Sequence, residues 1–432
     1  MTHRTALSVL FVACFGTSGC SPDLGGVFET SAGGAGGTTG TTATGGGGGT
    51  TTSGSTTSDT GTTSGSTTSS TGTISTGTGS CDPTQPNADT DKDGWSTLEG
   101  DCDDCDPEVN PGNIEIAGNA KDENCDGKKD EPLATCDETL VYDEADAMKA
   151  VKAVDLCKVS AGEKSWGVIT ADWSLADGSP PPQQNLTAFH RGHGALPDFG
   201  PNVKPRAGQR VFVLSSGTAR RPNDPGYQNP QNYDKGYTCA SAPNYPKEAA
   251  SCPGVQTGQP HDATAINVLF RVPGNAHGFS YDFSFYSYDF PQYVCSQYSD
   301  VFASILQPPP AGAVDGVLSY DETGSPISLN GANFRACSCM GGPCAGGNKT
   351  FDCPLGTTPL IGTGFDQQET GSFRGATGWL TTMVPAEPGS EVSIRWTVYD
   401  AADGQADSTA IIDNWRWITT PGVVTHTAIP AN

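Results

Sequence analysis

The chain has 432 residues, enough for two or more domains, and it carries a formal net charge of −25 with a pI near 4.4. We expect no binding to nucleic acid and no attraction to anionic membrane surfaces, because so acidic a chain is repelled by both. Hydrophobic residues make up only 35% of the sequence, because long stretches consist of Gly, Ser and Thr.

Residues 1–19 predict an export signal, since His3 and Arg4 precede an apolar run from 6 to 15. The run is too short to span a bilayer. Thr17-Ser18-Gly19-Cys20 follows it. This ending resembles the lipobox of bacterial lipoproteins, which implies that Cys20 becomes the lipidated N-terminus. With Ser21 next, the resemblance implies a lipid anchor in the outer membrane or at the cell surface of a Gram-negative bacterium. The alternative is an ordinary secretory signal with an incidental cysteine.

Residues 20–80 predict a disordered tether. Between Thr30 and Ser80 the only charged residue is Asp59 and the only large aliphatic one is Ile74. Such a segment cannot bury enough apolar surface to offset the entropy lost on ordering. We therefore expect it to hold the rest of the chain away from the envelope.

Residues 81–135 predict an acidic metal-binding module, in which positions 81–131 hold 16 acidic residues against 4 lysines. The alternating acids of D-x-D-x-D-G begin at Asp89 and recur, with Asn, at Asp122. This spacing is typical of calcium loops, because alternate side chains converge on one cation and Gly permits a sharp turn. We predict a Ca²⁺ site from Asp89, Asp91, Asp93, Asp101, Asp103, Asp104, Asp106, Asp122, Asn124, Asp126, Asp130 and Glu131. The competing interpretation is a solvated acidic linker.

These residues are not an EF-hand, because Gly100 stands at the twelfth loop position and no amphipathic helices flank the loop. The segments 89–94, 101–115 and 122–131 instead resemble the MopE-type metal-binding motif of bacterial surface proteins. That family name carries an association with copper, but copper favours imidazole and thioether ligands. No His or Met lies between Cys81 and Glu131, so copper is not carried over.

Residues 136–164 predict a connecting helix from Asp143 to Asp155. Asp143 is expected to cap it, and Met148, Val151 and Val154 form one apolar stripe. Cys136 and Cys157 flank this segment and are expected to form a disulfide.

Residues 165–432 predict an antiparallel β-sandwich of jelly-roll type, so the chain as a whole is mostly β. Period-two apolar patterns are separated by Gly, Pro and Asn turns, with no helices alternating between them. The expected strands cover 166–171, 211–215, 266–272, 279–285, 301–306, 392–398 and 410–417.

Export permits disulfides, and the chain has 15 cysteines. The connectivity of Cys81, Cys102, Cys105 and Cys125 stays open. Cys239 and Cys252 are disulfide candidates in the Pro/Asn/Tyr-rich loop 220–261. Seven cysteines lie between 239 and 353, so one thiol should stay unpaired or pair between chains. The group at 337, 339, 344 and 353 favours disulfides over zinc.

Segments of residues 165–417 resemble the choice-of-anchor L domain of bacterial exported proteins. The most specific is FSFYSYDFPQYVCSQYSDVF at 283–302, and STAIIDNWRW at 408–417 supports it. The resemblance implies a β-rich fold and an exported location, and it implies no reaction.

Three further groups could carry chemistry. Asp400, Asp403, Asp407 and Asp413 are either a second metal site or a hydrogen-bonded turn. Tyr281, Tyr286, Tyr288, Tyr293 and Tyr298, with Trp379 and Trp415, are either a carbohydrate face or, as we expect for most of them, packing. His190 and His193 are expected to lie in a polar loop.

Together these features predict a non-enzymatic envelope lipoprotein that displays a calcium-binding module and a β-sandwich for adhesion or for binding a glycan or matrix polymer. The alternatives are a secreted hydrolase built on the sandwich and a purely structural envelope protein.

Overall fold

The structure is a computed structural model that describes residues 85–242, 245, 248–310, 313, 316–321, 323–331, 334–339, 344–366 and 373–430. The predictions on the export signal, Cys20, the tether and Cys81 lie outside these residues. Within the described ranges, no helix has the length and apolar character needed to cross a membrane.

Most regular structure is extended. The strands are β1 (Gly167–Ser174), β2 (His193–Leu196), β3 (Val211–Ser215), β4 (Pro260–Arg271), β5 (Gly278–Ser287), β6 (Val301–Gln307), β7 (Ala336–Cys337), β8 (Cys344–Gly346), β9 (Lys349–Phe351), β10 (Gly375–Ala376), β11 (Leu380–Pro385), β12 (Glu391–Ala401), β13 (Ser408–Ile418) and β14 (His426–Ala428). The α-helices are α1 (Ala147–Ala150) and α2 (Leu186–Phe189), and short 3-10 turns cover Thr97–Glu99, Val151–Val154, Gln183–Asn185, His190–Gly192 and Thr358–Leu360.

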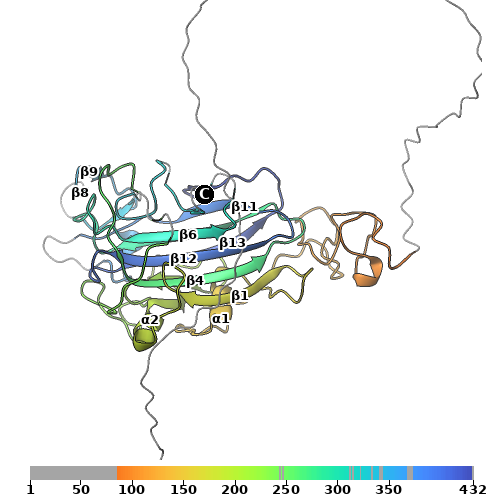
Figure 1. Cartoon of the computed structure of the whole chain (residues 1–432), viewed down its shortest axis with the longest axis horizontal. Helices are drawn as coiled ribbons and strands as arrows, with labels where there is room; N and C mark the ends of the chain where they lie inside the picture. The colour runs from red at the N-terminus through yellow and green to blue at the C-terminus, as the bar shows by residue number, and fades with distance from the viewer. Residues whose placement is uncertain are drawn as a thin grey trace, which may run out of the picture. The chain divides into compact units, whose positions relative to one another are not determined.

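The strands form two antiparallel sheets and a small hairpin. The first sheet has the order β1-β4-β12-β6, and these strands lie side by side in Figure 1. The second has the order β14-β11-β5-β13-β3-β2, with β10 beside β5 and β7 beside β10; β8 and β9 form the hairpin. The predicted antiparallel β-rich fold is confirmed.

The core between the sheets is built from the alternating residues that the sequence singled out. Phe270 and Val268 of β4, Phe283 of β5, and Ile394 and Trp396 of β12 are fully buried in one cluster. Because side chains alternate across a strand, every second residue of each of these strands points into this layer. Their burial as one cluster is the dominant favourable contribution to folding.

Loops cover the outer faces of both sheets, which the sequence did not indicate. A second cluster, with Phe189, Val301 and Tyr399, lies on the first sheet, and a third, with Tyr286 and Ile411, lies on the second. Every residue of β5 is consequently buried.

The connecting helix is shorter than expected and begins later. α1 starts at Ala147, and its cap is Asp146, whose side chain accepts a hydrogen bond from the Met148 amide at 3.0 Å. The prediction that Asp143 caps the helix is wrong. The predicted apolar stripe is confirmed, because Val151 and Val154 are buried in the main core and the partly buried Met148 packs against the same cluster.

The acidic module contacts the sandwich through the turn between β4 and β5 and through Trp166, the residue before β1. The Asn275 side chain donates to the Ile114 carbonyl at 2.7 Å and accepts from the Ile114 amide at 3.1 Å. The Gly274 amide donates to Gly112, and the Trp166 indole donates to the Asn113 carbonyl at 3.1 Å. These bonds hold a segment that contributes no residue to the three buried clusters.

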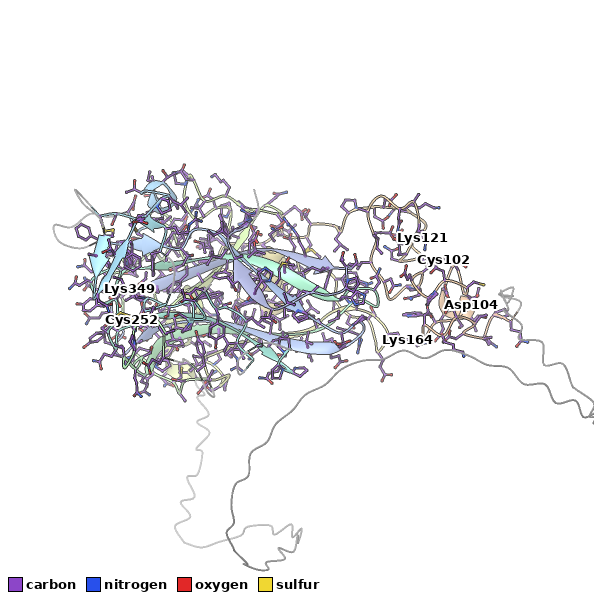
Figure 2. All side chains as sticks on the ribbon, turned by 90° about the horizontal axis from the view of Figure 1, so that it is seen from above. Cys102, Asp104, Lys121, Lys164, Cys252 and Lys349 are labelled. Atoms are coloured by element: carbon purple, nitrogen blue, oxygen red, sulfur yellow. A yellow bond between two sulfur atoms is a disulfide. The ribbon has the colours of Figure 1, made fainter. Side chains whose placement is uncertain are left out.

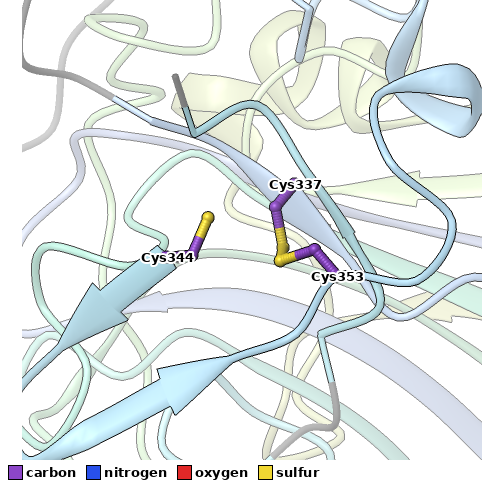
Figure 3. A group of neighbouring side chains, drawn as sticks. All are labelled: Cys337, Cys344 and Cys353. Atoms are coloured by element: carbon purple, nitrogen blue, oxygen red, sulfur yellow. A yellow bond between two sulfur atoms is a disulfide. The ribbon is translucent and has the colours of Figure 1, made fainter. Parts of the chain in front are cut away.

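Disulfides join Cys102 to Cys125, Cys136 to Cys157, Cys252 to Cys295, Cys337 to Cys353, and Cys339 to Cys344. Cys105 is also disulfide-bonded. The Cys136–Cys157 pair and the preference for disulfides over zinc are confirmed. The sulfur atoms of Cys337, Cys344 and Cys353 lie close enough together to bind one metal ion. Figure 3 shows that Cys337 and Cys353 instead form a disulfide with each other.

The prediction of a disulfide at Cys239 is wrong, because Cys252 pairs with a cysteine of the β5–β6 connection instead. Cys239 is the unpaired thiol expected in this half of the chain. It packs in the cluster on the first sheet, and burial raises its pKa to about 11.

Candidate metal centre

The first acidic loop closes on itself through its own backbone. The Asp89 carboxylate accepts from the amides of Lys92 at 2.6 Å and Gly94 at 3.0 Å. Asp91 accepts from the Asp93 amide, and Asp93 accepts from the Trp95 amide at 2.7 Å. Gly94 has φ +96, a conformation that favours glycine. The D-x-D-x-D-G spacing therefore gathers its carboxylates on the inside of a tight turn.

Two overlapping groups of three carboxylates meet at this turn. Asp91, Asp93 and Asp101 each place one oxygen within 4.8 Å of the other two, and so do Asp89, Asp91 and Asp104. Calcium binds oxygen at 2.3–2.6 Å, so ligands on opposite sides of one ion lie about 5 Å apart. Both groups have this spacing.

The buried oxygens fit a hard cation. Asp101 is 3% exposed and Asp104 is 2% exposed. One oxygen of Asp101 and one of Asp91 are buried without a hydrogen-bond partner among the described residues. A buried carboxylate oxygen without a partner costs free energy, and a bound cation removes that cost.

The electrostatics agree with the geometry. Burial raises the pKa of Asp101 to about 6, and repulsion from Asp93 and Asp91 adds to this effect. Burial likewise raises the pKa values of Asp91 and Asp93. The negatively charged forms are thus disfavoured unless positive charge is supplied.

The second half of the module uses its acids mostly as hydrogen-bond acceptors. Asp122 accepts from the Gly127 amide at 2.9 Å, and Asp126 accepts from Lys128. Asp130 accepts from the Gly118 amide at 2.6 Å. Asn124 donates to Glu131 at 3.1 Å, although the other Glu131 oxygen is buried without a partner. No three acids of this half converge within the described ranges.

Other predicted ligands also lie outside the two groups. Asp106 forms an ion pair with Lys121 at 2.6 Å, and Asp103 is exposed. Figure 2 shows Cys102, Asp104 and Lys121 within the module. Glu115 is not among the predicted ligands, but its carboxylate accepts hydrogen bonds from the amides of Asn124 and Asp130. Its place in the motif spacing was the available signal.

The structure does not assemble the predicted second site as a whole. Asp400 and Asp407 are buried near one another. Asp300 and Asp289, which the sequence did not single out, are buried beside them. Asp403 is exposed, and Asp413 lies six residues along β13, where it accepts from the Arg206 amide at 2.5 Å. Within the described ranges, no three of these acids share a space small enough for one ion.

This buried acidic group is nevertheless strongly perturbed. Burial, and then repulsion by Asp400, raise the pKa of Asp407, whose two carboxylate oxygens have no partner among the described residues. The nearby Lys235 is buried, and its ammonium donates to the Ser215 carbonyl and the Thr264 hydroxyl. Burial lowers the pKa of Lys235 to about 8.

The histidines differ from the expected polar loop. His193 is fully buried at the start of β2, stacked on Trp173 with ring centroids 3.7 Å apart. Its Nε2 lies 2.7 Å from Nδ1 of His190. Burial lowers the pKa of both rings.

Most of the tyrosines and tryptophans considered for a carbohydrate face are packing residues. Tyr281, Tyr286, Tyr288 and Trp415 are buried. Tyr293 is 37% exposed, and Tyr298 is half-buried beside it.

Comparison with known families gives one match in the acidic module and one in the β-sandwich. Residues 101–131 match the family model described as "Putative metal-binding motif", of the MopE type, which includes Asp101 and Asp104 but not the loop from Asp89 to Gly94. No curated protein and no solved structure matches the chain. Residues 200–415, half of the chain, match the model of the choice-of-anchor L domain, which begins at the loop before β3 and ends within β13. The protein therefore belongs to the choice-of-anchor L domain family.

Proposed function

We propose that the chain is a non-enzymatic lipoprotein of a Gram-negative envelope, which displays a calcium-binding module and a β-sandwich for adhesion or ligand binding. The observation that carries the calcium proposal is the group of Asp91, Asp93 and Asp101, with its buried oxygens that lack partners. The family matches support a surface-associated protein with a metal-binding motif.

Calcium fits this group better than other common cations. All donors are carboxylate oxygens, which hard cations prefer, whereas copper and zinc favour nitrogen and sulfur ligands. Magnesium requires a tighter octahedral shell at 2.0–2.1 Å. The loop is held mainly by its own backbone hydrogen bonds, so it should adapt more readily to the larger ion.

Calorimetry on the purified chain tests the calcium proposal. We expect a saturable heat with Ca²⁺, a much weaker one with Mg²⁺, and at least a tenfold loss of Ca²⁺ affinity in Asp91→Ala. Glu108→Gln removes one charge from an exposed side chain outside both groups and serves as the matched control. Absence of Ca²⁺ heat at millimolar concentration, with disulfides intact, would return the module to a solvated acidic segment.

The lipid anchor rests on the sequence Thr17-Ser18-Gly19-Cys20. Several acyl chains hold a protein firmly at a membrane, whereas a single chain binds reversibly. We therefore expect Cys20→Ser to move the protein from the membrane fraction to the soluble fraction. Equal membrane retention of the variant and the wild type would exclude acylation at Cys20 as the anchor.

A further inference from the structure

Four connections meet in a pocket of about 360 Å³ at one end of the sandwich. The β5–β6 connection contributes Tyr293 and Tyr298, and the β12–β13 turn contributes Asp403 and Gln405. The other two sources are the loop between β3 and β4 and the segment just before β10. A pocket of this size lies within the range of small-molecule sites, and none of its lining residues belongs to the acidic module.

The lining chemistry is polar with an aromatic rim. Four amide side chains, which can both donate and accept hydrogen bonds, line it: Gln231, Asn232, Gln292 and Gln405. The rings of Tyr293 and Tyr298 pack edge to face with centroids 5.4 Å apart. Tyr293 is the more exposed of the two and offers an aromatic surface together with a hydroxyl.

The charges in the pocket exclude anionic ligands. Asp289 and Asp403 line it against one cation, Arg374, whose guanidinium lies 3.1 Å from the ring centroid of Tyr288. Asp400 and Asp407 lie behind Asp289, and burial and mutual repulsion raise the pKa values of all three carboxyl groups. An anionic ligand would bring a further negative charge beside this group, so a phosphate, sulfate or uronic acid is unfavourable here.

Asp289 offers a buried hydrogen-bonding group to a ligand in the pocket. It is 5% exposed and lines the pocket, and burial raises the pKa of its carboxyl group. A carboxyl group can accept hydrogen bonds from ligand hydroxyls, and it can also donate one in its protonated form. A ligand hydroxyl entering the pocket would supply a hydrogen bond to this carboxylate.

The rim is held in place before any ligand binds. Cys295 lies between the two tyrosines in sequence and forms a disulfide with Cys252. The Asn330 side chain accepts a hydrogen bond from the Cys295 amide at 2.6 Å. The Ser296 hydroxyl donates to the Tyr293 carbonyl at 2.6 Å. Because little ordering remains to be done on binding, weak contacts in the pocket retain more of their free energy.

We propose that this pocket binds a neutral saccharide, with Tyr293 and Tyr298 against the apolar face of a sugar ring and Asp289 and the amides on its hydroxyls. This inference rests on the proposed ligand-binding function and names its ligand class and site. Sugars combine hydroxyls with an apolar ring face, which matches the mixture of amides, carboxylates and tyrosines.

Calorimetry of the full chain with defined probes tests it. The neutral probes are cellotetraose, xylotetraose, mannotetraose, laminaritetraose and chitotetraose, and polygalacturonate is the anionic comparison. We expect at least one neutral probe to bind saturably, with affinity at least tenfold lower in Tyr293→Ala, Tyr298→Ala and Asp403→Asn. Ile361→Ala, which truncates a 43% exposed residue outside the pocket, should bind like the wild type, and so should the wild type in EDTA.

Three results would overturn the proposal: no neutral probe binds, the three pocket variants bind as well as the wild type, or polygalacturonate binds better than every neutral probe. Retained thermal stability of each variant shows that a loss of binding is local. If the sugars fail while the Ca²⁺ and Cys20→Ser experiments succeed, only the saccharide assignment falls.

Discussion

Replacing Asp101 by Asn should change the stability of the acidic module in opposite directions with and without calcium. The Asp101 carboxylate is buried beside Asp91, Asp93 and Asp104. Asn keeps its shape, and its amide oxygen can still accept the 2.9 Å hydrogen bond from the Asp103 amide. Without a cation the substitution removes the cost of burying a charge and the repulsion from neighbouring carboxylates, whereas with bound Ca²⁺ it removes a charged ligand.

The size of the first effect follows from the pKa. A rise from 3.8 to about 6 corresponds to about 3 kcal/mol at 1.36 kcal/mol per unit. The module contributes no residue to the hydrophobic clusters, so we expect solvent screening to reduce this effect to about 1 kcal/mol. The calcium effect is larger, since a ligand at 100 times its Kd stabilises the bound state by about 2.7 kcal/mol.

Trypsin provides the assay, because the lysines at 121 and 128 are exposed in the module. When opening is fast relative to cleavage, the cleavage rate follows the population of the open state. In EDTA we expect Asp101→Asn to be cut about fivefold more slowly than the wild type. In saturating Ca²⁺ we expect it to be cut about tenfold faster. Glu108→Gln should be cut at the same rate relative to the wild type in EDTA and in Ca²⁺. A variant that is less stable than the wild type in both conditions would refute the reasoning.

Three further outcomes can be measured directly. Asp155→Asn should stabilise the protein at pH 8 but not near pH 4. Burial raises the pKa of Asp155 to about 6, so burying this side chain costs free energy only at a pH where its charged form is populated. Urea unfolding at both pH values measures the change in the free energy of unfolding, and equal changes at the two pH values would contradict the prediction. Gly217→Ala should lower the free energy of unfolding by roughly 1–3 kcal/mol, because a Cβ there would lie 1.8 Å from an Asp407 oxygen. An unchanged free energy of unfolding in the same assay would show that the Asp407 side chain moves freely. Cys239 should resist iodoacetamide in the native protein and react in urea, as peptide mapping would show, since it is buried with a pKa near 11; rapid native labelling would contradict its burial.

Strand alternation made the sandwich predictable. Val268 and Phe270 in β4, or Ile394 and Trp396 in β12, repeat every second residue, and only one face of a strand can hold such a pattern. β2 and β11 escaped prediction, because β2 is short and all four of its residues are buried, and Thr381, Thr382 and Met383 of β11 blur the alternation. The loops on the outer faces carry no periodic signal.

Local spacing predicted one acidic site better than the other. Asp91 and Asp93 converge because a turn of a few residues brings their side chains together. Asp400 and Asp407 meet because β12 ends and β13 begins at one end of the sandwich. The pairing of β12 with β6 places Asp300, the residue before β6, beside them. Sequence proximity placed Asp413 in that group, yet six residues of extended chain carry it about 20 Å away.

The distribution of buried side chains separates the stability of the module from that of the sandwich. The three hydrophobic clusters begin at Leu140 and contain no residue of the described segment 85–135. Segments without a core depend on disulfides and ions, and here the Cys102–Cys125 disulfide closes a segment whose carboxylates repel one another. The hydrogen bonds at Asn275 and Trp166 and the Lys164–Glu99 ion pair couple the two parts. Each hydrogen bond contributes only about 1 kcal/mol, and an exposed ion pair contributes little. If the proposed calcium site is correct, we therefore expect Ca²⁺ to control whether the module is folded, and we expect the sandwich and its pocket to keep their structure when Ca²⁺ is removed.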